Sequence, residues 1–410
     1  MTVKTFTAAE HGLQAEQIPP HAREVTETLQ RAGFEAYVVG GGVRDQLLGL
    51  HPKDFDIATN AKPEQIKALF PNCMLIGKRF RLAHIYFKRD IIEVATFRAG
   101  HDQASTDIAN TRDGIIIRDN VYGSLEEDAL RRDFAINALY FDPSKQTIID
   151  FSGGMQDIRN KKIRLIGDPK QRYQEDPVRI LRAVRFASKL NFTLDTATEA
   201  PLTEMVPLLA KMPAGRLFDE YTKLFLHGHG VNNFHTLCQY DAFRYLFPAS
   251  AEFSVLEPYR KLFLKSLHNT DLRISEGKSI NPAFLIAVFL WPALQQQLKL
   301  PVPDSSSTVE AFQFHMAVTV SRQLRHTAMP KRFSGAIKEI WILQRPMEHR
   351  KPKQIDRVLA HPRFRAAYDF LLLRSEMGEV SPAIVQWWTD IQLLDPEQRD
   401  KMIKDLKQKR

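Results

Sequence analysis

Two aspartates separated by a single residue, Asp54 and Asp56, are the first groups in the sequence whose type and spacing could do chemistry. Side chains alternate along a strand, so an extended run places both carboxylates on one face. Carboxylates gathered in this way can bind divalent cations. A lone Asp-x-Asp is usually a surface feature, so the pair needs support from its surroundings.

The residues just before the aspartates supply that support. The apolar run Ala36–Val39 predicts a buried strand ending in the glycines 40–42, and helical spacing follows. Gly41 and Gly42 would let backbone N–H groups approach a phosphate, and Arg44 would add a full positive charge. A glycine triplet alone is more often an ordinary turn. Combined with paired carboxylates one helix later, it predicts a site for a metal and a nucleotide.

Two common phosphate-binding signatures fail in this sequence. Asp45 stands where Gly-x-Gly-x-x-Gly requires its third glycine, and Leu272 stands where a P-loop ending at Gly277-Lys278-Ser279 requires its first. Rossmann and P-loop interpretations are therefore set aside.

Glu93 is an acid in a segment otherwise suited to burial. Three short strands are predicted over residues 74–76, 82–87 and 91–97. As a structural residue, Glu93 would be an edge-strand glutamate that faces water. As a functional residue, it would complete a three-carboxylate metal site with Asp54 and Asp56.

A second polar patch lies further along the chain. Residues 126–140 predict a helix on which Asp133 and Asn137 are one turn apart, just after Arg132. Such a patch can form hydrogen bonds with sugar hydroxyls and phosphates.

A change in pattern after about residue 155 indicates the domain organisation. The last predicted strand covers residues 147–151, and helical patterns dominate beyond it. The sequence therefore predicts an α+β protein, with a flexible arm over residues 1–20, a head domain with a small mixed sheet over residues 21–155, and an all-helical remainder.

Two basic regions in the helical part could contact nucleic acid. Glu175 and Asp176 precede a helix that carries Arg179, and this mixture of acids and a guanidinium suits the recognition of a base. Residues 331–365 contain ten Lys or Arg against three acids, with aromatic residues between them. Basic surfaces are often merely solvated, but this excess fits an RNA backbone. The predicted RNA-binding residues are Lys331, Arg332, Arg363 and Arg365.

Composition supports a globular protein with a polyanionic partner. The 410 residues suggest two or three domains, and the net charge is +9 with a pI of about 9.4. Only Cys73 and Cys238 occur, so a disulfide framework is excluded and a reducing compartment fits. We see neither a secretory signal nor an apolar run long enough to span a membrane, and expect a cytoplasmic protein.

Taken together, these motifs make the chain resemble the bacterial poly(A) polymerases of the class II nucleotidyltransferase superfamily, which also contains the CCA-adding tRNA nucleotidyltransferases. The resemblance covers residues 38–60, 75–98, 131–140, 164–189 and 361–374. Residues 75–84 and the stretch beginning at His361 are closer to the polymerases than to the CCA-adding enzymes.

The resemblance implies a catalytic head followed by a helical neck over residues 156–230 and an RNA-binding body and tail over residues 231–410. It implies two Mg²⁺ ions held by Asp54, Asp56 and Glu93, with Asp133 counted among the catalytic residues. The implied nucleotide-binding residues are Gly41, Gly42, Arg44, Arg132, Asn137, Glu175, Asp176 and Arg179.

The implied reaction is the template-independent addition of AMP from ATP to RNA 3′ ends, with release of pyrophosphate. CCA addition to tRNA is the nearest alternative. A catalytically silent RNA-binding protein is a second alternative, although such a protein has no need for three mutually repelling acids. RNA 3′ ends and ATP are the implied partners, together with proteins of RNA decay or RNA chaperones.

Overall fold

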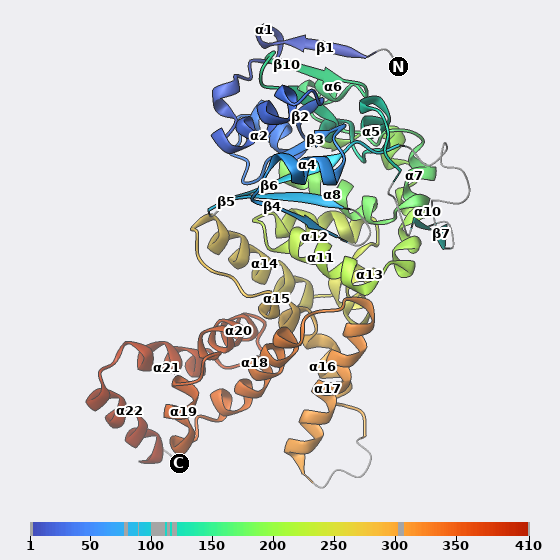
Figure 1. Cartoon of the computed structure of the whole chain (residues 1–410). Helices are drawn as coiled ribbons and strands as arrows, with labels where there is room; N and C mark the ends of the chain where they lie inside the picture. The colour runs from blue at the N-terminus through green and yellow to red at the C-terminus, as the bar shows by residue number, and fades with distance from the viewer. Residues whose placement is uncertain are drawn as a thin grey trace. The chain divides into compact units, whose positions relative to one another are not determined.

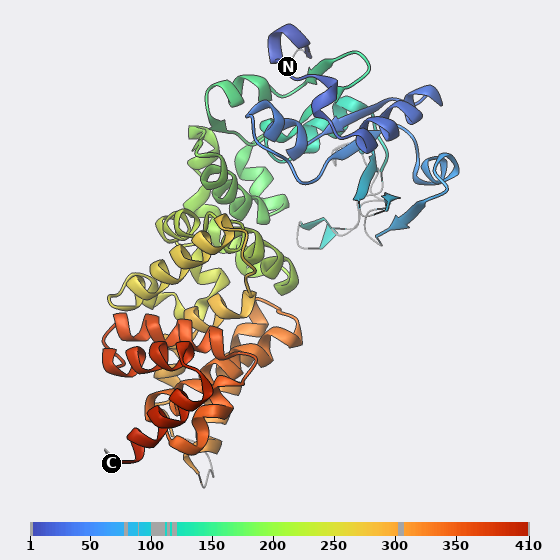
Figure 2. The ribbon, with the colours of Figure 1, turned by 90° about the vertical axis from the view of Figure 1, so that its left-hand side faces the viewer.

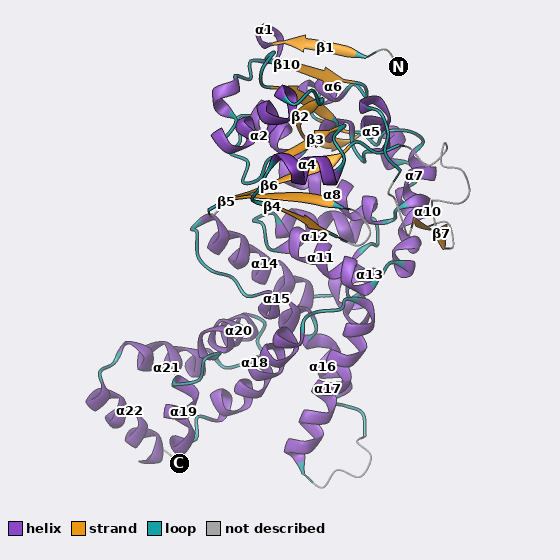
Figure 3. Cartoon of the chain, in the orientation of Figure 1, coloured by secondary structure: helices purple, strands orange, loops and turns teal. Residues whose placement is uncertain are grey.

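The computed structural model describes residues 3–77, 81–88, 90–99, 111–112, 115–116, 121–301 and 307–408. The chain divides into two compact units, Met1–Met205 and Val206–Arg410. Among the described residues, all strands belong to the first unit, and the second is built of helices (Figures 1, 2 and 3). This confirms the predicted α+β class. No helix in the described ranges is both long and apolar enough to cross a bilayer.

The first unit is organised around a mixed sheet of eight strands. β3 and β6 are parallel, and the other neighbours are antiparallel. In spatial order the strands are β1 (Lys4–Thr7), β10 (Thr147–Asp150), β9 (Leu139–Asp142), β2 (Ala36–Val39), β3 (Asp56–Thr59), β6 (Asp90–Thr96), β5 (Leu82–Phe87) and β4 (Cys73–Ile76).

The N-terminal segment differs from the predicted flexible arm. β1 pairs along its whole length with β10 and forms one edge of the sheet. α1 (Ala8–His11) and a 3-10 turn (Ala15–Gln17) follow, and Leu13 and Ile18 are buried. Backbone pairing and these two apolar side chains hold the segment, and neither a short strand nor two isolated apolar residues is a strong sequence signal.

Two helices cover one face of the sheet. α2 (Pro20–Arg31) packs on β2, β3 and β6, and α4 (Pro63–Leu69) packs on β4 and β5. Val38, Ile57 and Val94, neighbours in register across three strands, have no exposed surface on this side. This face is the main core of the first unit.

Within the part of the chain that the structure describes, the opposite face is covered over only part of its width. α5 (Leu125–Arg131) covers the region of β2 and β9, where Tyr37, Val39 and Tyr140 form a buried cluster. Further across, on β6 and β4, Ile91 and Met74 are 49% and 59% exposed. The sheet therefore has a covered part and an open part on the same face.

The predicted helix over residues 126–140 is wrong in its second half. α5 ends at Arg131, a 3-10 turn covers Ala135–Asn137, and β9 begins at Leu139. Phe134 and Leu139 are fully buried. A short apolar run of this kind fits a central strand as well as a helix, and only the pairing of β9 with β2 and β10 decides between them.

Residues 154–205 complete the first unit. They form α6 (Gly154–Arg159), β11 (Lys162–Ile163), α7 (Pro169–Glu175), α8 (Val178–Leu190), β12 (Thr193–Leu194), α9 (Thr196–Glu199) and α10 (Leu202–Met205). β11 and β12 pair in parallel, so the predicted neck is not purely helical. The unit boundary at residue 205 falls inside that predicted neck, because α6 and α8 contact elements of the first unit. The boundaries at residues 155 and 230 stay predictions.

The second unit is a set of helices packed around aromatic side chains such as Trp341 and Trp388, which are fully buried. Its helices are α11 (Ala214–Phe225), α12 (Gly230–Gln239), α13 (Phe243–Leu246), α14 (Tyr259–Ser275), α15 (Pro282–Phe289), α16 (Trp291–Gln297), α17 (Thr308–His326), α18 (Lys331–His349), α19 (Ile355–Leu359), α20 (Phe364–Glu376), α21 (Pro382–Leu393) and α22 (Pro396–Gln408).

A buried arginine ties three of these helices together. Arg374 of α20, 5% exposed, donates hydrogen bonds to Glu379 at 2.9 Å and to Glu348 of α18 at 2.6 Å. Its guanidinium lies 4.5 Å from the ring centre of Trp291 of α16, whose indole N–H also donates to Glu379. The positive charge of Arg374 is therefore paired with two glutamates and packed against the ring of Trp291.

Candidate active site

Asp56 and Glu93 are neighbours in register on the parallel strands β3 and β6. Residues in register share a face of the sheet, and Asp54 stands just before β3, two residues from Asp56. β6 lies between β3 and β5, so the edge-strand interpretation of Glu93 is wrong. The side chain of Glu93 is nevertheless 42% exposed, which leaves it accessible from solvent.

The three acids repel one another. Asp56 keeps exposed surface, yet the atoms packed around its carboxyl desolvate it. This burial, followed by the charge of Glu93 and a smaller effect of Asp54, raises the pKa of Asp56 to about 6 against the opposing effect of Arg132. The ionised carboxylate is therefore disfavoured until a cation compensates it.

Three carboxylates fit a hard cation such as Mg²⁺, which prefers oxygen ligands. As they stand, no three His, Cys, Asp or Glu side chains within the described ranges converge closely enough to hold an ion. Glu93 instead lies 3.3 Å from His84 Nε2 on β5. The ligand types and the raised pKa of Asp56 suit a metal site, and binding would require these side chains to turn toward one another.

The glycine turn lies directly beside Asp56. Gly40 has φ +80° and ψ −139°, a backbone conformation that side chains disfavour. A Cβ at Gly40 would stand 3.7 Å from Asp56 Oδ2 and 3.8 Å from Arg132 Nη1. At Gly42 it would stand 2.9 Å from the ring of Phe55, closer than real Cβ atoms come. The structure thus brings the predicted turn and the aspartates together.

Arg44 faces the protein interior. It belongs to α3 (Gly41–Leu47), a helix of only seven residues that begins at Gly41, and it is 3% exposed. Its guanidinium donates to Asp45 at 2.8 Å and to the side chain of Asn137 at 2.5 Å. Arg44 and Asn137 are therefore hydrogen-bonded to each other. This differs from the prediction that both contact a nucleotide.

Asp133 is also engaged within the protein. It accepts hydrogen bonds from Asn137 at 3.1 Å and from Arg182 of α8 at 2.6 Å. Burial acts to raise the pKa of Asp133, but Arg182 and these hydrogen bonds outweigh it and lower the pKa to about 2. Asp133 thus connects the 3-10 turn to α8, and its contacts are with this group rather than with Asp54, Asp56 and Glu93.

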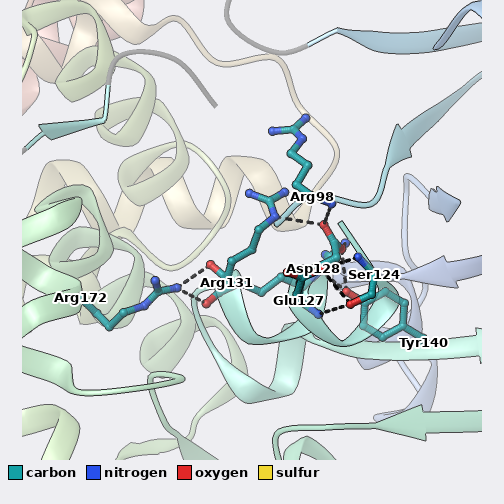
Figure 4. Close-up of polar contacts among 8 residues, drawn as sticks. Arg98, Ser124, Glu127, Asp128, Arg131, Tyr140 and Arg172 are labelled. Atoms are coloured by element: carbon teal, nitrogen blue, oxygen red, sulfur yellow. Dashed lines mark hydrogen bonds and ion pairs between the residues drawn. The ribbon is translucent and has the colours of Figure 1, made fainter. Parts of the chain in front are cut away.

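Arg132 is held beside Gly40 by a buried acid and a tyrosine. Its Nε donates to Tyr140 Oη at 2.8 Å, and its Nη2 donates to Asp128 Oδ2 at 3.0 Å. Tyr140 donates to the same Asp128 oxygen at 2.7 Å, and Arg131 binds the other oxygen of Asp128 (Figure 4). Hydrogen bonds hold Nε and Nη2 of the guanidinium. The remaining nitrogen, Nη1, is therefore positioned toward the glycine turn at Gly40.

Arg172 of α7 connects this group to the predicted base-reading residues. It donates to the backbone carbonyls of Arg131 and Arg132 at 2.5 and 2.7 Å (Figure 4). Its Nη1 also donates to Glu175 at 2.8 Å, and Arg179 donates to the same Glu175 oxygen at 3.1 Å.

The three predicted base-reading residues are close together at the junction of α7 and α8. Glu175 ends α7, Asp176 caps it, and Arg179 lies in the first turn of α8. Glu175 pairs with Arg179, and Asp176 accepts from the backbone of Val178 at 3.4 Å. This mixed acid and guanidinium edge is the arrangement that the sequence predicted.

Sequence reasoning missed Asp128, Tyr140 and Arg172. Asp128 stands three and four residues before Arg131 and Arg132, a spacing that predicts ion pairs on a helix. Tyr140 and Arg172 carry no local signal, because their partners are brought to them by the tertiary fold.

We expect Asp128→Asn to destabilise the protein in a pH-dependent way. Burial acts to raise the pKa of Asp128, but Arg132, Arg131 and the Tyr140 hydroxyl lower it to about 2. This pKa lies below the unfolded value, so the stabilisation is present above about pH 4 and is lost as the pH falls toward 2. Denaturant unfolding should show a gap of about 2 kcal/mol between wild type and variant at pH 7. A gap that does not narrow as the pH falls from 4 to 2 would contradict this role.

Three of the four predicted RNA-binding residues line a groove in the second unit. The groove has a volume of about 900 Å³ and is lined by Arg332, Arg363 and Arg365, with Arg273 and Lys278 of the α14 region. Lys331 is exposed but outside the lining. Three acids, Glu276, Asp369 and Glu376, also line the groove, so cations exceed anions by two.

Comparison with known families matches three parts of the chain. Residues 36–164 match the model described as the poly A polymerase head domain. Residues 191–253 match the model described as a probable RNA and SrmB-binding site of polymerase A, and residues 304–410 match the polymerase A arginine-rich C-terminus. Residues 78–80, part of the stretch that resembles polymerases more than CCA-adding enzymes, lie outside the described residues.

Curated relatives are similar over nearly the whole chain. Poly(A) polymerase I of Haemophilus influenzae is 43% identical over 97% of this chain and 90% of its own length. Poly(A) polymerase I of Escherichia coli O6:H1 is 42% identical over 98% of this chain and 89% of its own. The CCA-adding enzyme of Lactobacillus helveticus is 39% identical, but over only 52% of this chain and 51% of its own.

Solved structures share the fold. A Thermotoga maritima CCA-adding enzyme complexed with tRNA has a TM-score of 0.63 at 20% identity, covering 96% of this chain and 86% of that one. An apo CCA-adding enzyme has a TM-score of 0.65 at 20% identity, covering 97% and 89%.

Proposed function

The chain belongs to the poly(A) polymerase I family of nucleotidyltransferases, and on this premise we propose that it adds AMP from ATP to RNA 3′ ends without a template and releases pyrophosphate. The single observation that carries the proposal within the structure is the placement of Asp56 beside Glu93 and directly next to the glycine turn. We further propose that it acts in the cytoplasm in RNA processing. Its protein partners stay a prediction.

In the proposed mechanism, Asp54, Asp56 and Glu93 would hold two Mg²⁺ ions. The chemistry supplied by such ions is a lowered pKa of the attacking 3′-hydroxyl and compensation of charge on the phosphates. The acids are needed as ligands, so none of them has to accept the proton itself. Their repulsion in the metal-free protein, visible in the raised pKa of Asp56, is what the ions would relieve.

Arg132 is a better candidate than Arg44 for the side chain that contacts the triphosphate. Its Nη1 lies beside Gly40 and Asp56, whereas Arg44 is buried against Asp45 and Asn137. Asp128 and Tyr140 fix the other guanidinium nitrogens, so Arg132 presents a positioned charge at the turn. Gly40 leaves room for a phosphate to approach, because a side chain there would stand against both groups.

The choice of nucleotide tests the proposal. With an unstructured RNA, ATP alone should support long, open-ended extension and CTP should be used poorly. Arg179→Ala should blur this preference, because removing a side chain that reads a base typically costs about 1–3 kcal/mol of discrimination. The ratio of kcat/KM for ATP and CTP measures the effect in wild type and variant.

A tRNA that lacks its 3′ end provides the control for the CCA-adding alternative. ATP and CTP are offered together to this tRNA and to an unrelated RNA. If only the tRNA is extended, and extension stops after C, C and A, the chain is a CCA-adding enzyme and the proposed function is wrong.

RNA binding by the groove of the second unit should depend strongly on salt. Cations that neutralise phosphates release counterions, so log K should fall steeply with log salt concentration. Replacing Lys331, Arg332, Arg363 and Arg365 together with glutamine should make the slope shallower, by about 0.7 for each phosphate of a single strand that is no longer neutralised. Because Lys331 lies outside the groove lining, restoring it alone should change the slope little. An unchanged slope in the fourfold variant would place the RNA elsewhere.

A further inference from the structure

The acids stand at the border between the covered and open parts of one sheet face. In register across the sheet, Val39, Asp56, Glu93, His84 and Met74 form a row on β2, β3, β6, β5 and β4. Val39 lies in the cluster under α5 and is 1% exposed, whereas Met74 at the other end is 59% exposed. Beyond the acids in this row, the side chain of His84 is 22% exposed and Met74 is largely exposed, so the row becomes more accessible toward β4.

The open part is unusually apolar for a solvent-facing surface. Two residues along β6 from Glu93, Ile91 is 49% exposed, and Ile76 of β4 is 39% exposed. Tyr86, in register with Ile91, is half-buried and its ring centre lies 6.5 Å from that of His84. Apolar and aromatic side chains grouped around an active site mark a binding surface.

The two sides of the acids differ in chemistry. On the β2 side lie Gly40 and Arg132, which suit phosphates. On the β5 and β4 side lie His84, Met74 and Ile76, which suit flat apolar groups such as bases. Strands are about 4.8 Å apart and residues two apart about 6.7 Å, so this surface begins within one nucleotide of the acids.

We propose that the open surface, formed by Met74, Ile76, His84, Tyr86 and Ile91, binds the bases at the 3′ end of the RNA strand. The proposal rests on the proposed function, since it is the 3′-hydroxyl that must reach the acids. The triphosphate then approaches Asp56 from the side of β2 and the RNA from the side of β5. Bases of any sequence can stack on such a surface, which fits addition without a template.

The test compares exposed apolar residues of the open surface with an exposed apolar residue at the far edge of the sheet. Ile91→Gln and Met74→Gln alter the open surface without opening the core, because both side chains are about half exposed. Val3→Gln is the matched control, since Val3 is 53% exposed and precedes β1 at the opposite edge. The variants at the open surface should raise the KM for RNA about fivefold or more while leaving the KM for ATP unchanged.

An RNA that lacks its 3′-terminal base makes the assignment specific. Wild type and Val3→Gln should use this abasic RNA less well than the intact strand, and the double variant Ile91→Gln/Met74→Gln should no longer distinguish the two. A 4-thiouridine at the 3′ end should crosslink to β4, β5 or β6, a readout that does not need turnover.

The outcomes separate the two proposals. If wild type extends RNA and the variants keep its KM and its discrimination against the abasic strand, the open surface does not bind the 3′ end. Crosslinks confined to other elements would overturn the inference equally. If wild type adds no AMP to any RNA, the proposed function fails instead.

Discussion

Asp56→Asn should lower the rate of AMP addition by more than about a hundredfold while leaving the protein folded. The carboxylate stands in register with Glu93 and 3.7 Å from a Cβ position at Gly40, so it lies where both proposed substrates meet. Asparagine has nearly the same shape as aspartate but carries no charge, and a ligand for Mg²⁺ at this site requires the negative charge. Primer extension with Mg²⁺ and radiolabelled ATP measures the loss.

The same variant should be at least as stable as wild type in chelator at pH 7.5. Burial, Glu93 and Asp54 raise the pKa of Asp56 to about 6, above its unfolded value. The folded protein therefore binds the proton more tightly, and wild-type stability falls as the pH rises from about 4 through 6. Asp56→Asn removes this loss, so the two melting temperatures should converge below about pH 4.

Asp90→Asn serves as the control, because Asp90 is an exposed acid on the same strand β6 but on the opposite face from Glu93. It should extend RNA at the wild-type rate. If Asp56→Asn extends RNA at close to the wild-type rate, the carboxylate site is not part of the mechanism.

The second large effect is expected in the second unit. Arg374→Met should destabilise it by about 3 kcal/mol, because Glu348 and Glu379 lose the charge that pairs them and the face of Trp291 loses its cation. Both glutamates are partly exposed to water. The expected loss of stability is therefore near the lower end of the range for breaking a buried ion pair. Urea unfolding followed by helical circular dichroism measures it.

Arg244→Met is the matched control. Its pair with Asp241 is more than half exposed on both sides, and exposed pairs contribute at most about 1 kcal/mol. If both variants lose the same free energy of unfolding, the buried ion pairs of Arg374 stabilise the protein no more than an exposed ion pair does.

The parts of the site that the sequence predicted are those determined locally. The glycine turn at Gly40 and the alternation around Asp56 follow from residue types within about twenty positions. Glu93 could be named as an acid in an apolar strand, although its place in the interior of the sheet depends on pairing with β3 and β5.

The parts that the sequence could not predict depend on distant partners. Arg44 has the type and position of a phosphate ligand, but Asn137 and the pair formed by Asp45 with Lys189 draw it into the interior. Asp133 likewise acquires its role from Arg182, 49 residues away. Tertiary partners of this kind decide whether a polar residue faces substrate or protein, and no local pattern reveals them.

The contact between Gly42 and Phe55 has a consequence for how the segment between them can evolve. The ring of Phe55 packs against the helix backbone at Gly42, and residues 49–53 pass over the surface, largely exposed. The position of the aspartates is therefore set by this contact and by the pairing of β3 with β2 and β6, and not by the length of that loop. Insertions or deletions in it should be tolerated by the enzyme, whereas any residue larger than glycine at position 42 should be rejected.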